Sequence, residues 1–360
     1  MRMTTKRETR LCHADDPRQQ APPAGAGSPG ADLWAIVLAG GEGRRLERFV
    51  RHVLRNEAPK QFCRIIGTRS MLRHTWDRAL RMVEQDRIVT VITAGQQRYL
   101  AAEGRGGVPG TVFVQPENKE TAPGLLLPLL WIEKLSPAAT VVVFPADHFI
   151  WEEGRFIAHM WAAVAAAHSI PDRLILLGVE ADGPETGYGW IAPGDPVEAV
   201  REAEVYAVRR FWEKPDGPTA ARLFASGYLW NTFILAGRLG AFLEMAEAAI
   251  SEVMAALGRV QARLGTPAEP GALREIYGQI PRANFSQLVL ARQAQRLLLL
   301  PARGITWSDW GDPDRIVRTL ARVDRRPAWL PAYAGATVRD PAWAREAHIM
   351  GAERSGHVSV

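Results

Sequence analysis

The stretch Trp34-Ala35-Ile36-Val37-Leu38 runs directly into Ala39-Gly40-Gly41-Glu42-Gly43-Arg44-Arg45-Leu46. The first five residues are apolar and favour a buried strand, and the glycines behind them predict a sharp turn from strand to helix. At such a turn the backbone amides are exposed, and the missing Cβ atoms let a phosphate approach closely. The arginines add positive charge. The turn is therefore a candidate phosphate site, although a plain tight turn explains the glycines equally well.

Two familiar phosphate-binding motifs do not fit this turn. A P-loop ends in Gly-Lys-Ser/Thr, which is missing here. A dinucleotide-binding turn requires an acidic residue at the end of the second strand, about 20 residues further on. The chain has the basic sequence Pro59-Lys60-Gln61-Phe62 in that window, which counts against a nicotinamide cofactor.

Beyond the turn, short apolar runs alternate with helical stretches, a pattern typical of βαβ units and a mostly parallel sheet. The alanine-rich segment Ala158–Ala167 suits a crossover helix. We further expect an extended ribbon over Glu198–Lys214 and a long amphipathic helix on the outside of the core over Gly240–Leu264. The predicted strands are Trp34–Leu38, Ile88–Thr93, Thr111–Val114, Thr140–Phe144 and Leu174–Val179.

Composition narrows the classes of protein that remain. The 360 residues are 47% hydrophobic and carry a formal charge of +5, spread through Arg-rich stretches that also contain acidic residues. This balance favours small anionic ligands at least as well as nucleic acid. The chain has only two cysteines, Cys12 and Cys63, and no apolar run of the roughly 18 residues that a membrane span needs. We expect a cytoplasmic protein that binds neither membrane nor nucleic acid.

The chain divides into three parts by composition. Residues 1–30 mix charges, Gln, Pro and Gly without apolar periodicity and predict a disordered tail. Residues 31–325 carry the α/β pattern. Residues 326–360 form a C-terminal extension that we expect to be partly disordered.

Seven segments together resemble the sugar-1-phosphate nucleotidyltransferases, especially the mannose-1-phosphate guanylyltransferases, in type and in order. They span Leu38 to about Gly311, most of the chain. The segments are Leu38–Leu46 with Pro59–Phe62, Thr121–Pro123, Phe144–His148, Pro184–Ile191, Phe211–Pro215, Trp230–Asn231 and Trp307–Asp309.

The resemblance implies a Rossmann-like, doubly wound, GT-A-like fold and one reaction. An oxygen of a hexose 1-phosphate attacks the α-phosphorus of a nucleoside triphosphate, and pyrophosphate leaves with magnesium. GTP and mannose 1-phosphate are the favoured pair, and a homodimer is left open. Such a transfer depends mainly on positioning two anions and stabilising the charge that builds up.

The resemblance also assigns the catalytic roles. Arg45 takes the place of the family's catalytic arginine, and its planar guanidinium can hold two phosphate oxygens. Lys60 neutralises phosphate charge as the family's lysine does. Asp147 follows the apolar run Val141–Phe144, at the strand edge where open α/β sheets bind ligands, and is the first candidate for the Mg²⁺ ligand. Asp309 is the second. Solvated arginines and helix-capping aspartates are the alternatives.

The remaining site residues are assigned to one or the other substrate, and several have a structural alternative. Arg44 could share the role of Arg45 or face solvent. The glycines around Tyr188 could form an ordinary hairpin, and Glu213 and Lys214 could form a surface ion pair. We expect nucleotide contacts from Ala39, Gly40, Gly41, Gly43, Arg44, Gln115, Thr121 and Ala122, and sugar-phosphate contacts from Gly187, Tyr188, Gly189, Glu213, Lys214 and Asn231.

Three departures from the family pattern leave questions open. The charged segment Arg44–Ala58 is longer than the usual loop, so the cover over the triphosphate is expected to differ. Gln115 and Glu120 replace the usual Glu and Asn near the nucleobase. An inactive, sensor-like relative is the second hypothesis, but it predicts loss of the catalytic arginine or the aspartates, which are present. Nucleic-acid binding is a third, and Arg201–Arg210 offers it only weak support.

Overall fold

The computed structural model of the chain describes residues 32–103, 107–200 and 203–339. The predicted N-terminal tail, residues 1–30, and the part of the predicted C-terminal extension after residue 339 lie outside these ranges. The strands are β1 (Leu33–Leu38), β2 (Ile88–Thr93), β3 (Thr111–Gln115), β4 (Thr140–Pro145), β5 (Phe149–Ile150), β6 (Leu174–Glu180), β7 (Gly189–Pro196), β8 (Tyr206–Glu213), β9 (Leu229–Arg238), β10 (Leu297–Pro301) and β11 (Trp307–Ser308). The helices are α1 (Glu47–His52), α2 (Met71–Ala79), α3 (Gln97–Ala102), α4 (Thr121–Leu135), α5 (Glu153–Ser169), α6 (Gly217–Ala225), α7 (Leu239–Gly258), α8 (Glu269–Tyr277), α9 (Pro313–Arg322) and α10 (Leu330–Arg339).

A nine-stranded sheet with the order β3-β2-β1-β4-β9-β6-β10-β8-β7 forms the centre of the molecule. Strands β1 to β4 pair in parallel, and β6 pairs in parallel with β10. Among the described strands of this sheet, only β8 and β9 run in the opposite direction. The mixed, mostly parallel, doubly wound α/β fold is therefore confirmed, and all five predicted strands are present.

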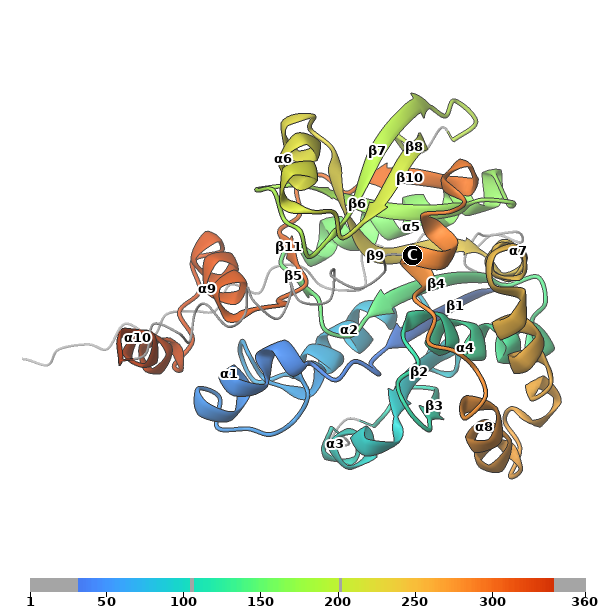
Figure 1. The fold of residues 1–360 in the computed structure, drawn as a ribbon, viewed down its shortest axis with the longest axis horizontal. Coiled ribbons are helices and arrows are strands. Elements are labelled where there is room, and N and C mark those ends of the chain that lie inside the picture. Colours follow the sequence, from blue (N-terminus) through green and yellow to red (C-terminus); the bar gives the residue numbers. More distant parts are fainter. Residues whose placement is uncertain (1–31, 104–106, 201–202, 340–360) are drawn as a thin grey trace, which may run out of the picture.

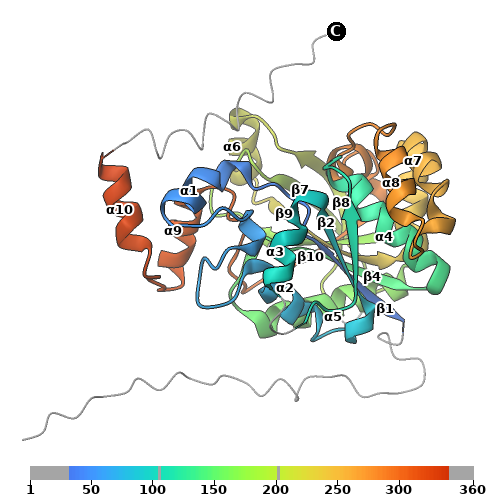
Figure 2. The same ribbon diagram turned by 90° about the horizontal axis from the view of Figure 1, so that it is seen from below.

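Two apolar layers cover the sheet because its central strands are apolar on both faces. In β1, Ala35 and Val37 pack in one core cluster while Trp34 and Ile36 pack in the other. Helices α2 and α5 contact the strands on one face, and α4 and α7 on the other. Figures 1 and 2 show α1, α9 and α10 gathered at one end of the molecule and α7 and α8 at the opposite end. The predicted crossover helix is the central part of α5.

Three expected elements take a different form. The segment Arg44–Ala58, expected as a loop, contains helix α1, because buried Phe49 packs edge-on against Trp329 in the C-terminal extension. Within the predicted ribbon, the regular strand is Tyr206–Glu213. The predicted long helix is kinked where Ile250 leaves helical geometry and ends at Gly258 rather than Leu264. Its apolar stripe packs against α4.

None of the described helices is both long enough and apolar enough to cross a membrane.

His74 on α2 makes the fold sensitive to acid. Its Nε2 atom is buried without a hydrogen-bond partner among the described residues, and burial, with help from Arg78 and Arg69, lowers its pKa from 6.5 to about 4. The unfolded chain binds this proton more readily, so stability is fully present above pH 6.5 and falls as the pH drops toward 4. The loss reaches on the order of 2 kcal/mol by pH 5.

The prediction is tested by urea unfolding at pH 7 and pH 5. We expect His74→Leu to lose less stability between the two pH values than the wild-type chain, since leucine has no proton to bind. His159→Gln, a change at a half-buried histidine on α5, should keep the wild-type difference. An unchanged pH dependence in His74→Leu would contradict the assignment.

Candidate active site

The glycine turn and Asp147 lie at the same edge of the sheet because they follow neighbouring parallel strands. Leu38, at the end of β1, is in register with Pro145, at the end of β4. The amide of Ala146 donates to the carbonyl of Leu38 at 2.9 Å, which continues the pairing past the strands. Asp147 therefore emerges beside the turn, at the edge where open α/β sheets bind ligands.

A small ribbon brings Asp309 back to this edge from far along the chain. Strand β11 pairs antiparallel with β5, and Ser308 is in register with Phe149. The residue after Ser308 thus lies next to the segment that holds Asp147 and His148. Arg78 on α2 supports this segment: its side chain binds Glu153 and donates to the backbone carbonyls of His148 and Ile150.

Lys60 joins the two aspartates. Its side chain is 6% exposed, and its Nζ atom lies 2.7 Å from Asp147 Oδ2. The same atom donates to the backbone carbonyl of Asp309 at 2.5 Å and lies 3.4 Å from that of Trp310. Burial by itself would raise the pKa of Asp147, but the charge of Lys60, the His148 ring and the hydrogen bond from Lys60 together lower it below its usual value. One buried cation therefore holds both segments together.

The residue after Lys60 holds the glycine turn. Gln61 Nε2 donates to the carbonyls of Ala39 and Gly41, and Gln96 Nε2 donates to Gly41 as well. Gly43 has φ +65°, and a Cβ there would lie 3.2 Å from the Lys60 amide, so a side chain would strain the turn and crowd the lysine. The turn is thus fixed from behind, and Gly41 is exposed at its front.

The carboxylate of Asp309 is fixed by hydrogen bonds to one of its two oxygens. Oδ1 accepts from Tyr188 Oη, Arg315 Nη1 and the Gly311 amide, each at 2.8 Å. Oδ2 lies 3.8 Å from Arg45 Nη2. Despite burial, Arg315, Lys60 and Arg45 hold the pKa of this carboxyl well below its usual range, so it is ionised at neutral pH.

The two arginines of the turn differ. Arg45 faces Asp309 with a side chain that is 43% exposed, which leaves its guanidinium accessible to a ligand. Arg44 is more exposed and pairs with Glu42 at 2.5 Å. The geometry therefore places Arg45, Lys60, Asp147 and Asp309 in one cluster, with Arg44 at its rim.

The predicted sugar-side residues meet through strand pairing. Gly189 at the start of β7 is in register with both Glu213 and Asn231. A Cβ at Gly189 would lie 3.0 Å from Glu213 Oε2 and 3.1 Å from Asn231 Cβ, so the approach requires glycine. Burial raises the pKa of Glu213, whose carboxylate lies 3.8 Å from Lys214 Nζ. Tyr188 connects this group to Asp309.

Three residues predicted to contact the nucleotide are already engaged within the protein. Gln115 Oε1 accepts from Tyr277 Oη at 2.9 Å, and its Nε2 packs close to Gly40 and Gly124. The Thr121 hydroxyl accepts from the Phe285 amide. Ala122 is fully buried and its amide donates to Ala283, so it has no accessible surface for a ligand.

His148 and Trp230, two aromatic residues beside the site, make contacts that indicate structural roles. His148 accepts from Trp307 Nε1 through Nδ1 at 3.3 Å, and burial lowers its pKa to about 4, which keeps it neutral. Trp230 is buried and packs edge-on against Tyr188 and Trp190. Trp230 therefore belongs to the core beneath the sugar side.

The two aspartates suit a hard divalent cation. Each has one oxygen bound by the protein, Asp147 Oδ2 by Lys60 and Asp309 Oδ1 by three donors. The second oxygens lie 3.8 Å from His148 Nε2 and 3.8 Å from Arg45 Nη2, respectively. Within residues 32–103, 107–200 and 203–339, no three His, Cys, Asp or Glu side chains gather to hold a metal by themselves. Mg²⁺ commonly takes only one or two carboxylates and completes its shell with water and phosphate.

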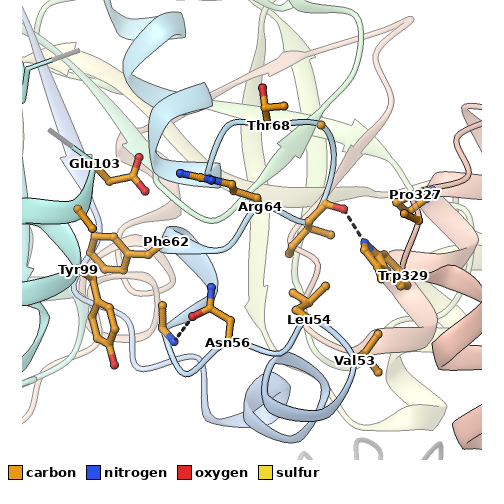
Figure 3. Close-up of a pocket in the computed structure, with 15 residues that line it drawn as sticks. Val53, Leu54, Asn56, Phe62, Arg64, Thr68, Tyr99, Glu103, Pro327 and Trp329 are labelled. Carbon is orange, nitrogen blue, oxygen red and sulfur yellow. Dashed lines mark hydrogen bonds between the residues drawn. The ribbon is translucent and has the colours of Figure 1, made fainter. Parts of the chain in front are cut away.

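A separate hollow of about 730 Å³ lies between the segment after α1, helix α3 and the C-terminal extension (Figure 3). Phe62, Tyr99 and Trp329 supply its aromatic walls, and Trp329 Nε1 donates to the carbonyl of Ile65. None of the predicted site residues lines it. Phe62 links it to the cluster, because this residue shares a turn with Lys60.

Two site residues escaped the sequence analysis as functional candidates. Gln61 was part of a recognised motif, and its position next to Lys60 was the available signal. Arg315 had no such signal, since it belongs to no quoted motif, although Asp312-Pro313 before it is a typical helix start.

The site combines a glycine turn, an accessible arginine, a buried lysine and two carboxylates. These groups suit the binding of phosphorylated ligands. The chain belongs to the nucleotidyl transferase family, whose sequence profile it matches over residues 34–325.

Individual relatives share part of the chain. It is 34% identical over 218 residues to the xanthan biosynthesis protein XanB of Xanthomonas campestris, a match that covers 59% of this chain and 44% of that protein. It is 31% identical over 288 residues to the mannose-1-phosphate guanylyltransferase ManC of Salmonella typhimurium, covering 78% and 58%. The chain thus aligns with about half the length of these relatives.

A solved structure has the same fold. The crystal structure of "mannose-1-phosphate geranyltransferase" from Thermus thermophilus superposes with a TM-score of 0.68 at 26% sequence identity, covering 82% of this chain and 80% of that one.

Proposed function

We propose that this chain transfers a nucleoside monophosphate from a nucleoside triphosphate to a hexose 1-phosphate and releases pyrophosphate. The observation that carries the proposal is the cluster around Lys60, which brings Asp147, Asp309 and the arginine of the glycine turn to one edge of the sheet. The family and the names of the relatives support the same reaction.

The residues of the cluster suit each part of this transfer. The sugar-phosphate oxygen forms a bond to the α-phosphorus, and the bond from that phosphorus to the bridging oxygen of pyrophosphate breaks. The nucleophile is already an anion, so no general base is needed, in line with a neutral His148. Exposed amides of the turn and Arg45 bind the triphosphate, and Lys60 adds positive charge beside it.

We assign the divalent ion as Mg²⁺, held by Asp147 and Asp309 together with phosphate oxygens. When bound, it would neutralise the charge that develops on the leaving pyrophosphate. On the sugar side, Glu213 and Asn231 offer acceptors and a donor to hydroxyl groups, and Lys214 offers a cation to the phosphate. Tyr188 places this side next to Asp309.

The favoured substrates are GTP and mannose 1-phosphate, because relatives such as that from Salmonella typhimurium are named mannose-1-phosphate guanylyltransferase. Gln115 stands near the expected nucleobase site, but its carbonyl oxygen is bound to Tyr277, so its Nε2 amide is the group left for recognition. We include a cytoplasmic location, because the chain has only two cysteines and Cys63 is a free, buried thiol. Homodimerisation remains part of the proposal to be tested.

The test is pyrophosphate release with Mg²⁺, each of the common nucleoside triphosphates, and a panel of hexose 1-phosphates. We expect release that requires both substrates and the metal, fastest with GTP and mannose 1-phosphate. A different preferred pair would correct the specificity and keep the reaction. Binding of substrates without release from any pair would favour the sensor hypothesis, and no binding would refute both.

A further inference from the structure

Arg315 is a buried arginine at the base of the cluster. It lies in the first turn of α9, where its amide donates to the N-capping carboxylate of Asp312 at 2.8 Å. Its side chain is 10% exposed. A buried guanidinium is costly unless it is fully paired, so its partners indicate what it does.

The guanidinium of Arg315 contacts three carboxylates and one ring. Nη1 donates to Asp309 Oδ1 and Nη2 donates to Glu185 Oε2, both at 2.8 Å. Nε lies 3.2 Å from Asp312 Oδ2, an ion-pair distance, but donates no hydrogen bond to a described residue. The guanidinium carbon stands 4.4 Å from the centre of the Tyr188 ring, a cation–π distance. Anchoring α9 would account for the Asp312 contact but not for the other three.

The contacts of Arg315 join the two sides of the site. Asp309 belongs to the proposed metal side, whereas Glu185 and Tyr188 belong to the loop that leads into β7 on the sugar side. Gly311 leaves room for this arrangement, because a Cβ there would lie 3.1 Å from Nη1 of Arg315 and closer still to Asp309 Oδ2 and Arg45 Nη2. A lysine could not replace this geometry, since one ammonium cannot reproduce the planar fork of donors.

We propose that Arg315 is a positioning residue that fixes Asp309 through Oδ1, leaves Oδ2 available toward the nucleotide, and ties the sugar-side loop Glu185–Gly189 to that carboxylate. The proposal rests on the proposed transfer reaction. It predicts that loss of Arg315 affects the metal side and the sugar side together, whereas a change at Glu185 affects the sugar side alone.

The test compares Arg315→Met, Arg315→Lys and Glu185→Gln with Arg318→Met. Arg318 is a matched control, because it lies on the same helix and approaches the same Glu185 at 3.4 Å with a side chain that is 67% exposed. Three quantities are measured: Mn²⁺ binding in the presence of α,β-methylene GTP by electron paramagnetic resonance, steady-state kcat and KM, and amide hydrogen exchange of residues 185–189 in the ligand-free protein.

In Arg315→Met we expect Mn²⁺ affinity and kcat to fall by about 10- to 100-fold, as is usual when a group that orients a metal ligand is lost. The KM for the sugar phosphate should rise, and exchange in the loop should accelerate. Arg315→Lys should recover part of the metal affinity but not the loop protection. Glu185→Gln should raise the KM and accelerate exchange with unchanged Mn²⁺ affinity, and Arg318→Met should match wild type.

Wild-type Mn²⁺ affinity and loop exchange in a folded Arg315→Met protein would overturn the proposal. If that variant fails to fold, Arg315→Lys and Glu185→Gln decide: wild-type values in both overturn it as well. Absence of turnover in the wild-type chain would instead count against the transfer reaction, and the exchange measurement would still test the tie between Arg315 and the loop.

Discussion

Asp147→Asn is expected to abolish turnover while the chain stays folded. The substitution keeps the volume of the side chain and removes the negative charge that a divalent ion needs. Its amide oxygen can still accept from Lys60, so the buried lysine keeps a partner. Loss of a bound ion at developing charge costs several kcal/mol, so kcat should fall on the order of 1000-fold or more.

Pyrophosphate release, measured at increasing Mg²⁺, gives kcat and the metal dependence, and a thermal melt checks the fold. Asp182→Asn is the control, because Asp182 is an exposed aspartate whose described partner is Arg322 at the surface. We expect the control to keep wild-type kinetics. Normal turnover in Asp147→Asn would remove Asp147 from the metal site and with it the central element of the mechanism.

Lys60→Met is expected to produce the second-largest loss, in both activity and stability. The change removes the cation beside the phosphates, which should lower kcat/KM about 100- to 1000-fold, as loss of a preorganised donor does. It also leaves the carbonyl of Asp309 without its buried donor and Asp147 without its closest cation. Unpaired buried groups of this kind cost about 1–3 kcal/mol.

Urea unfolding and steady-state kinetics separate the two effects. Lys134→Met is a matched control, because Lys134 also donates to backbone carbonyls, those of Ala262 and Leu264, but outside the site. It should lose some stability and keep wild-type kcat/KM. If Lys60→Met lost stability only, the role of Lys60 would be structural, and the proposed contribution of its charge at the phosphates would be wrong.

The local sequence was enough to predict the positions of the central strands and of the glycine turn. Runs such as Thr140–Phe144 have a composition that buries well only in a covered sheet, and the structure has them as strands within one or two residues. The position of Asp147 followed from the same signal, since a polar residue after a buried strand must emerge at the sheet edge. Of the glycines of the turn, Gly43 has φ +65°, which favours glycine, whereas a Cβ at Gly41 would meet no atom within 4 Å.

Local sequence patterns could not predict which side chains far apart in the chain contact one another. The sequence suggested Glu213 and Lys214 as ligands but could not show that Gly189 sits in register with both Glu213 and Asn231, which depends on the antiparallel pairing of β7. The resemblance predicts a loop over the charged segment Arg44–Ala58, because typical family members have one there, but the structure has helix α1 within it. Its stability comes from Phe49 packing against Trp329, some 280 residues later.

The α/β class, the glycine turn and the residue types that suit phosphorylated ligands can all be predicted from the chain, because each depends on neighbours within a few positions. How these groups face one another depends on the folded arrangement of the strands. That arrangement places the ammonium of Lys60 against Asp147 and the Asp309 carbonyl, and Arg315 against the carboxylate of Asp309 and the sugar-side loop. Buried charges are stable only when paired, and which partners meet is set by strand order and register rather than by local sequence.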